Sequence, residues 1–188
     1  MTEITDDYGK TVPAAVQAFV LEWGNLGERW GVNRSVSQIH ALLYASPQPL
    51  AAEDIAEALG IARSNVSNSL RELQAWNLIR PVPILGDRRT FFQAETDLWT
   101  LVARIAAGRK TRELDPAAAA LRNCVELSRN DKSLDPVVLH RLRDMLEFVE
   151  RISRWYEQMI ALPRSTLVTL IRLGGGIARL LPRTGKRE

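Results

Sequence analysis

The chain has 188 residues, 46% hydrophobic and 25% charged, which gives enough apolar material for a buried core in one or two small domains. Its 25 Lys and Arg exceed its 22 Asp and Glu by only +3, so net charge alone does not establish a nucleic-acid partner. A single cysteine excludes an intramolecular disulfide, and the polar, acidic start lacks the pattern of a secretory signal. We therefore expect a cytoplasmic protein.

Two helices are predicted before the first proline-rich break. Residues 12–30 carry apolar side chains at helical spacing along one side, namely Val16, Phe19, Val20 and Trp23. Ser35 and Gln38 form a capping-box pattern, which predicts that a second helix opens there and continues through Tyr44. The sequence SPQP then ends this second helix.

The next two predicted helices are short and lie close together in the sequence. Residues 51–59 form the first, and Gly60 stops it because glycine readily takes the left-handed conformation at a helix end. Ser64 is suited to cap the second helix, which we expect to run to about Leu78.

The spacing of small residues in this helix pair indicates a helix-turn-helix. Ala56, Gly60 and Val66 stand at i, i+4 and i+10, where a tight helix crossing needs a small residue, a turn and an apolar anchor. The pattern often adds an apolar residue at i+13, whereas this chain has Ser69 there and Leu70 beside it. The departure affects the expected rotation of the second helix.

Residues 80–95 read as a β-hairpin directly after the helix-turn-helix. Gly86 and Asp87 form a turn signal, and strand-forming TFFQ follows. Two prolines in the first strand cannot donate to a ladder, so we expect that strand to be short or at a sheet edge. Arg88 and Arg89 lie just past the tip, which makes the hairpin a basic wing.

Positive charge and short polar side chains gather in this region. Residues 61–90 hold five arginines against two acidic residues, and residues 164–188 hold six cations against one. Two asparagines and one arginine of the predicted second helix can bind base edges, and an arginine and two serines near its start can bind phosphates. The two wing arginines can bind in a narrow minor groove. The predicted DNA-binding residues are Asn65, Asn68 and Arg71 for bases, Arg63, Ser64 and Ser67 for phosphates, and Arg88 and Arg89 for the minor groove. A merely solvated helix face and hairpin tip are the alternative.

The remainder of the chain is predicted to be helical. Residues 97–110 form one helix, and Asp115-Pro116 and Asp135-Pro136 each signal the start of another. The last helix has an apolar seam with alternating spacings of four and three, formed by Val138, Leu142, Met145, Val149, Ile152, Tyr156 and Met159. We expect this seam to form a homodimer interface, and a long core helix within one chain is the alternative.

These motifs resemble a known family. The sequence LAAEDIAEALGIARSNVSNSLRELQAWNLIR, followed by GDRRTFF, looks like the MarR-type winged-helix repressors, and is most similar to their GbsR-like (glycine betaine synthesis repressor-like) branch. The resemblance covers about residues 35–95. It implies a homodimer that binds double-stranded DNA, a recognition helix over residues 64–78, a wing tip at residues 86–89 and a small-molecule effector.

The expected fold class is mostly α with a small β-hairpin wing: a winged helix-turn-helix flanked by N- and C-terminal dimerisation helices. The expected divisions are residues 1–33 as an N-terminal helix joining the dimer region, 34–96 as the DNA-binding domain, 97–163 as the helical dimerisation region, and 164–188 as a basic C-terminal tail. That tail contains the longest apolar run, which arginines and three glycines interrupt, so we expect no stable membrane insertion. We expect disorder after about residue 183.

Other chemistry finds little support. His40 and His140 each sit among apolar neighbours in a predicted helix, and neither belongs to a cluster with metal-ligand spacing, so we expect no enzyme, no metal and no cofactor. The GGG at residues 174–176 lacks the strand and spacing of a dinucleotide loop. Cys124 is interpreted as a buried small residue, with a redox sensor as the alternative.

Aromatic residues suggest one weaker hypothesis. Trp99, Trp155 and Tyr156 could line a cage for a quaternary ammonium effector of the kind that the GbsR-like resemblance suggests, although packing explains them as well. The overall reading is a sequence-specific, ligand-responsive repressor acting as a homodimer on an inverted-repeat operator. The alternative is a winged helix that serves as a protein-interaction or architectural module without base readout.

Overall fold

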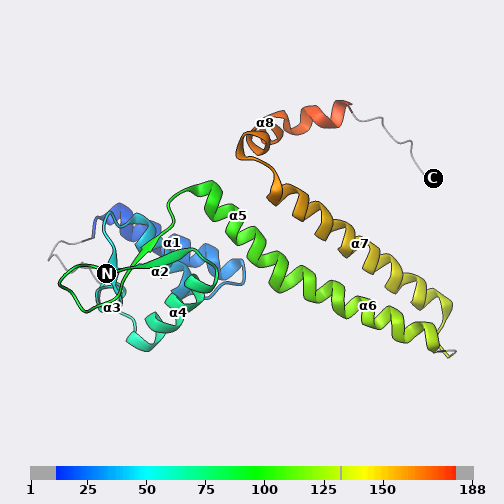
Figure 1. Cartoon of the computed structure of the whole chain (residues 1–188), viewed down its shortest axis with the longest axis horizontal. Helices are drawn as coiled ribbons and strands as arrows, with labels where there is room; N and C mark the ends of the chain where they lie inside the picture. Colours follow the sequence, from blue (N-terminus) through cyan, green and yellow to red (C-terminus); the bar gives the residue numbers. More distant parts are fainter. Residues whose placement is uncertain (1–11, 132, 181–188) are drawn as a thin grey trace. The chain divides into compact units, whose positions relative to one another are not determined.

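The computed structural model describes residues 12–131 and 133–180. The chain divides into two compact units, Met1–Ile105 and Ala106–Glu188, which are described separately (Figure 1). The fold class predicted from the sequence is confirmed: the structure is mostly helical with one small antiparallel sheet and winged-helix topology.

The first unit combines short helices with a three-stranded sheet. The helices are α1 (Ala14–Arg29), α2 (Arg34–Ala45), α3 (Ala52–Leu59) and α4 (Arg63–Ala75), and α5 (Leu98–Arg109) begins in this unit. The strands β1 (Leu50–Ala51), β2 (Ile79–Val82) and β3 (Phe91–Ala94) have the order β1-β3-β2 and are all antiparallel. The strand with the proline, β2, therefore lies at an edge as predicted. Strand β1 was not predicted, because two apolar residues before a helix carry no alternating pattern.

The core of the first unit is built around α2. Ile39 of α2, Ile55 of α3 and Val66 of α4 are each fully buried and belong to one hydrophobic cluster. Two glycines of α1 allow a close approach to α2, since a Cβ added at Gly27 would lie 1.9 Å from Ser37 Oγ. Helix α2 thus packs against α1 on one side and the helix-turn-helix on the other.

Two predicted helix starts are wrong by one or two residues. Asn33, not Ser35, caps α2, because the Asn33 carboxamide oxygen accepts a hydrogen bond from the Ser35 backbone N–H at 2.8 Å. Helix α4 begins at Arg63 after an extended Ala62, so Ser64 already lies inside its first turn. Helix α4 also ends earlier than predicted, at Ala75.

The second unit is a helical hairpin followed by a further helix. It contains the end of α5, a π-helical turn η1 (Lys110–Leu114), α6 (Asp115–Asn130), α7 (Pro136–Ala161) and α8 (Arg164–Leu180). Asp135 caps α7 as predicted, since its carboxylate accepts from the Val137 N–H at 2.8 Å. Helices α6 and α7 run antiparallel and pack against each other (Figure 1).

Helix α6 begins at Asp115 with Pro116 in its first turn, as predicted, but Asp115 does not cap it. Asp115 has helical backbone angles, and helical conformation continues from α5 through η1 into α6. Its N–H donates to the carbonyl of Lys110, five residues back, as in a π-turn. The wider turn accommodates the ring of Pro116, which would clash with a carbonyl in a regular α-helix.

The segment expected as a basic tail is also helical over much of its length. Helix α8 spans Arg164–Leu180 and includes the three glycines, with its first turn closed by the Thr166 N–H donating to the carbonyl of Pro163 at 2.9 Å. The expectation of disorder near the C-terminus falls on residues outside the described part of the chain. Among the described residues, no helix is long and apolar enough to cross a membrane.

The described part of the second unit exposes large apolar side chains. Buried hydrophobic residues there are limited to Ala118 and Val125, and no residue of α7, which is described in full, is buried. Five members of the predicted seam are half-buried, while Val138 and Met145 are exposed. The exposed large residues of this unit are Leu127, Val137, Val138, Met145, Phe148, Trp155, Ile171 and Leu173.

Candidate nucleic-acid interface

Helix α4 has one buried face and one polar exposed face. Val66, Leu70 and Leu73 are 0 to 3% exposed and pack into the core. The opposite face exposes the side chains of Arg63, Ser64, Ser67, Asn68 and Arg71. This division follows the 3.6-residue period of the sequence, so five of the six predicted DNA-binding residues of α4 gather on one accessible surface.

A tight turn sets where the exposed face of α4 begins. Gly60 ends α3 with φ +62°, and the Ile61 N–H donates to the carbonyl of Ala56 at 3.1 Å, as in a Schellman motif. No side chain caps the N-terminus of α4, and its first turn carries no acidic residue. These backbone N–H groups and Arg63 together favour an anion such as a phosphate.

Arg71 is held in place by its own helix. Its guanidinium donates from Nη2 to the Asn68 carboxamide oxygen and from Nε to the carbonyl of Ser67 at 3.4 Å. These contacts hold the charged fork near the middle of the exposed face. Guanidinium and carboxamide groups are the side chains that pair best with guanine and adenine edges.

Asn65, predicted as a base contact, differs from the other α4 residues because its side chain is hydrogen-bonded within the first unit. Its side chain is half-buried and donates from Nδ2 to Ser35 Oγ of α2 at 2.9 Å, while Ser69 Oγ donates to Asn65 Oδ1 at 3.4 Å. The carboxamide therefore links α4 to α2 in place of facing outward. Ser69, at the i+13 position, is 2% exposed and is buried with Leu70.

The wing is the hairpin of β2 and β3 with its connecting loop. Gly86 turns the loop with φ +87°, a conformation that favours glycine. The Arg88 side chain is exposed and has no hydrogen-bond or ion-pair partner among the described residues. Leu85, next to Gly86, is fully exposed at 104%, an apolar tip that the sequence analysis missed although Leu between Pro and Gly in a turn signals it.

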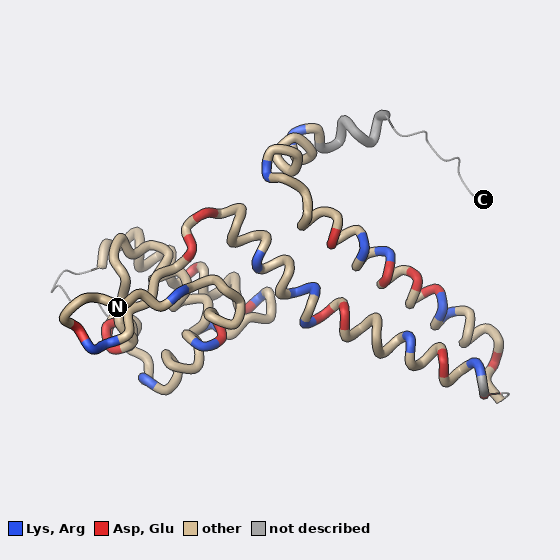
Figure 2. The backbone as a smooth tube through the Cα atoms, in the orientation of Figure 1, with Lys and Arg blue, Asp and Glu red and all other residues tan. Residues whose placement is uncertain are grey.

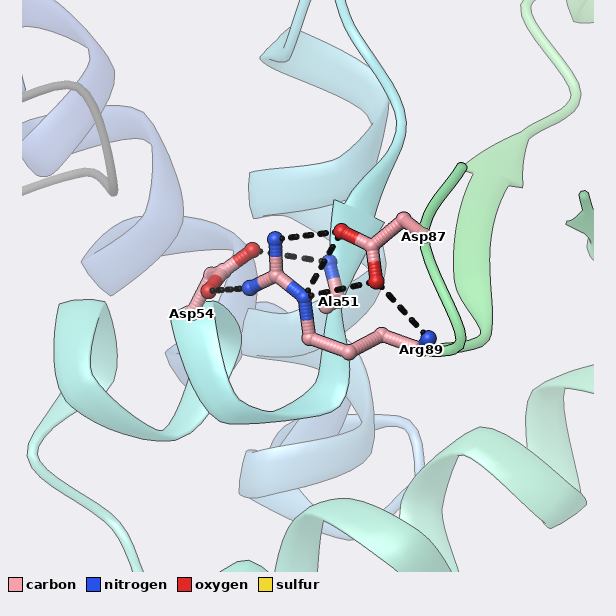
Figure 3. A network of polar contacts seen from close by, with 4 residues as sticks. All are labelled: Ala51, Asp54, Asp87 and Arg89. Atoms are coloured by element: carbon pink, nitrogen blue, oxygen red, sulfur yellow. Dashed lines mark hydrogen bonds and ion pairs between the residues drawn. The ribbon is translucent and has the colours of Figure 1, made fainter. Parts of the chain in front are cut away.

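Arg89, predicted as a minor-groove contact, makes ion pairs within the first unit. Its guanidinium lies 3.1 Å from Asp54 Oδ1 and 2.9 Å from Asp87 Oδ2 (Figure 3). The same guanidinium lies 4.9 Å from the ring centroid of Phe91. The other Asp54 oxygen accepts from the Ala51 N–H at 3.1 Å. Arg89 thereby fastens the wing loop to the start of α3.

The carboxylates of Asp54 and Asp87 both lie against the Arg89 guanidinium. The side-chain hydrogen bond from Arg89 lowers the pKa of Asp87 below its ordinary value. Asp54 is 6% exposed, so its negative charge depends on the Arg89 guanidinium and the Ala51 N–H for compensation. Figure 2 colours the basic and acidic positions along the backbone, including those of α4 and of the wing loop.

The remaining predicted site residues lie elsewhere. His40 is 6% exposed in α2 with Nε2 unpaired, and burial lowers its pKa to about 4, whereas His140 is exposed beside Asp144. Cys124 is exposed, so its interpretation as a buried small residue is wrong for this chain. The described residues contain no group of three or more potential His, Cys, Asp or Glu metal ligands.

The residues of the hypothetical aromatic cage fall in different units. Trp99 belongs to the first unit, and Trp155 and Tyr156 belong to the second. The rings of Trp155 and Tyr156 meet edge to face at a centroid distance of 6.4 Å. An edge-to-face pair offers one ring face to a cation, whereas an aromatic cage surrounds the cation with two or more ring faces.

Comparison with known proteins addresses the helix-turn-helix and wing directly. Residues 26–90, which include α2, α3, α4 and the wing arginines, match the sequence model of the MarR family. Over these residues the chain is similar to the winged helix of the MarR family. The match covers the part of the chain whose geometry is described above.

Individual proteins are similar over a longer stretch. The HTH-type transcriptional regulator MmpR5 of Mycobacterium tuberculosis is 25% identical over 142 residues, covering 73% of this chain and 81% of MmpR5. A crystal structure of a transcriptional regulator covers 78% of this chain and 95% of its own, at 20% identity and a TM-score of 0.57, and shares the fold. A mutant of S. aureus MepR bound to an oligodeoxyribonucleotide aligns at 23% identity, over 72% of this chain and 90% of its own, with a TM-score of 0.36.

Proposed function

We propose that this protein is a sequence-specific transcriptional regulator that binds double-stranded DNA as a homodimer. The observation that carries the proposal is the exposed face of α4, where Ser67, Asn68 and Arg71 follow an uncapped, basic helix start. In a winged helix this face enters the major groove while the wing lies along the neighbouring minor groove. Arg88 is the wing side chain available for that contact.

The DNA contacts divide by chemistry. Arg71 and Asn68 have the donor and acceptor geometry for base edges, whereas Arg63, Ser64 and Ser67 surround the helix N-terminus and suit phosphates. Asn65 and Arg89 take positioning roles: they hold α4 against α2 and the wing against α3. The similarity to MmpR5, whose name is that of a transcriptional regulator, supports this reading.

The second unit supplies the argument for a homodimer. This unit exposes many large apolar side chains to water, and packing against a second copy would bury them. The seam on α7 remains the proposed interface. Two-fold symmetry would then require an inverted-repeat operator with half-sites about one helical turn, ~10 bp, apart.

Repression, response to a small effector and membership of the GbsR-like branch are the finer parts of the proposal. They rest on the sequence resemblance. A cationic effector at the Trp155–Tyr156 pair would bind by cation–π contact. If choline and betaine change neither the tryptophan fluorescence nor the DNA affinity, the hypothesis of a quaternary ammonium effector is refuted.

A second candidate function follows from the wing tip. Ile84 is 39% exposed and Leu85 is fully exposed, and neighbouring apolar residues on a loop suit a protein partner. In that case α4 and Arg88 would be dispensable for binding the partner.

The test of the proposed function measures binding to a fluorescent duplex carrying the region upstream of the coding sequence, and to a scrambled duplex, between about 50 and 200 mM salt. We expect tighter binding to the native duplex that persists at the higher salt. Arg71→Ala should cost about 1–3 kcal/mol and relax preference at one base position. Arg141→Ala on α7, which removes an exposed arginine outside the interface, is the matched control.

Two outcomes would count against the proposal. Equal and salt-sensitive binding to both duplexes would indicate an architectural protein. Loss of affinity for all sequences alike in Arg71→Ala would make Arg71 a phosphate contact and remove it from base readout.

A further inference from the structure

A polar pocket lies at the base of the wing, away from the exposed face of α4. Its volume is about 560 Å³, within the range of small-molecule sites. Every lining residue belongs to the first unit, and the lining comes from the turn after α4, both wing strands, the segment after β3 and α5: Asn77, Ile79, Arg80, Gln93, Ala94, Glu95, Thr96 and Arg104.

The backbone turn that follows α4 forms one wall of this pocket. Asn77 has φ +55°, and its N–H and that of Leu78 donate to the carbonyls of Gln74 and Leu73, which closes α4 in a Schellman motif. The carbonyl of Asn77 accepts a hydrogen bond from Arg104 Nη1 of α5. The Asn77 side chain is exposed and has no hydrogen-bond partner in the described part of the chain.

A cross-strand pair forms the opposite wall. Arg80 of β2 and Gln93 of β3 are directly paired in the sheet register, and Arg80 Nη2 donates to Gln93 Oε1 at 3.1 Å. The neighbouring side chains of Ile79 and Ala94 are buried on the other face of the sheet. Arg80 and Gln93 therefore project together on the pocket side.

The charges in the pocket do not balance. Arg104 pairs with Glu95 at 3.1 Å, so these two residues compensate each other. Arg80 contacts the neutral Gln93 amide and makes no ion pair with any described residue. Its Nε and Nη1 donors also remain open, which leaves the pocket with a net charge of +1.

We propose that this pocket binds a small hydrophilic oxyanion, a carboxylate or phosphate group on a polar organic molecule, with Arg80 as the residue that pairs with the anion. A guanidinium with adjacent free donors matches the two oxygens of such a group. The Gln93 and Asn77 amides and the Thr96 hydroxyl can then bind hydroxyl groups of the same molecule. The ordered Arg104–Glu95 pair keeps the second guanidinium and the carboxylate from competing for the anion.

The proposal does not depend on DNA binding, because all of the groups that carry it belong to the pocket. Isothermal titration calorimetry of the full chain without DNA tests it, with citrate and inorganic phosphate as anionic probes and glycerol as a neutral probe. We expect at least one anion to bind and glycerol not to bind. Binding of citrate alone assigns the site to carboxylates, and binding of phosphate alone assigns it to phosphorylated molecules.

Variants locate the site. Arg80→Gln should weaken the anion roughly 10- to 100-fold, as expected for loss of hydrogen bonds to a charged group. Arg141→Gln, an exposed arginine of α7, removes the same charge elsewhere and should leave the affinity unchanged. Because Arg80 is exposed, Arg80→Gln should unfold at the wild-type temperature, which separates lost binding from lost structure.

The proposal is overturned if neither anion binds, or if both anions bind the Arg80→Gln variant as tightly as the wild-type protein. Equal weakening by Arg80→Gln and Arg141→Gln would also overturn it, because that result would indicate general attraction of anions by net charge.

Discussion

The contact between the wing and α3 allows a prediction whose size follows from the structure. Asp54 is almost fully buried, and its partners include the Arg89 guanidinium at 3.1 Å and the Ala51 N–H at 3.1 Å. Asp54→Asn keeps an oxygen for the Ala51 N–H but removes the charge that faces Arg89. Asp54→Ala removes the carboxylate that accepts hydrogen bonds from Arg89 and from the Ala51 N–H. The Ala51 N–H is then left without this acceptor in a buried position.

The two Asp54 variants should therefore differ in stability. A hydrogen bond to a charged group is worth about 1.5–3 kcal/mol, and an unsatisfied buried donor costs about 1–3 kcal/mol more. We expect Asp54→Asn to lower the free energy of unfolding by about 1–2 kcal/mol, because Arg89 is 39% exposed and water screens part of its charge. Asp54→Ala should lower it by roughly 2–4 kcal/mol.

Urea unfolding followed by far-ultraviolet circular dichroism measures both values. A double-mutant cycle with Arg89→Gln isolates the pair, and the loss caused by Arg89→Gln should shrink markedly in the Asp54→Asn background. Asp87→Asn is the control, because the ion pair of Asp87 with the same guanidinium lies nearer to solvent and should contribute little to the free energy of unfolding.

Two results would refute the reasoning. Stability losses that simply add in the double mutant would mean that Asp54 and Arg89 do not interact energetically. An Arg89→Gln variant with wild-type stability but weakened DNA binding would return Arg89 to the minor groove, as the sequence alone suggested.

Three further predictions concern the wing, the proposed dimer and pH. Arg88→Ala should weaken DNA binding and reduce the slope of log affinity against log salt by about 1, measured by fluorescence anisotropy, and an unchanged slope would remove Arg88 from the interface. Val149→Glu should shift the protein to monomers in analytical ultracentrifugation and reduce its DNA affinity. Arg143→Glu, at an exposed position on the side of α7 opposite the seam, is the control and should leave the dimer intact. A dimer that survives Val149→Glu would move the interface off the α7 seam. Because burial lowers the pKa of His40 from 6.5 to about 4, the unfolded state binds the extra proton first, so stability should fall by roughly 3 kcal/mol as the pH drops from 6.5 to 4. His40→Phe should flatten that part of the urea-stability profile, and an identical profile would mean that other groups cause it.

Local sequence determined the parts of this protein that depend on neighbours along the chain. The spacing of Ala56, Gly60 and Val66 predicted the helix-turn-helix, because a crossing of two short helices constrains residue size at fixed intervals. Alternation and turn residues predicted the wing, and the helical period separated the buried Leu70 from the exposed Arg71. These features need no knowledge of distant residues.

Tertiary structure decided which polar side chains remain available. Asn65 and Arg89 look like DNA contacts in the sequence, yet Asn65 bonds Ser35, thirty positions away, and Arg89 pairs with Asp54, thirty-five positions away. The pocket depends in the same way on Arg80, Gln93 and Arg104 meeting from three elements. The direction of a side chain is set by the partner that folding brings to it, and a polar residue in a linear pattern carries no mark of that partner.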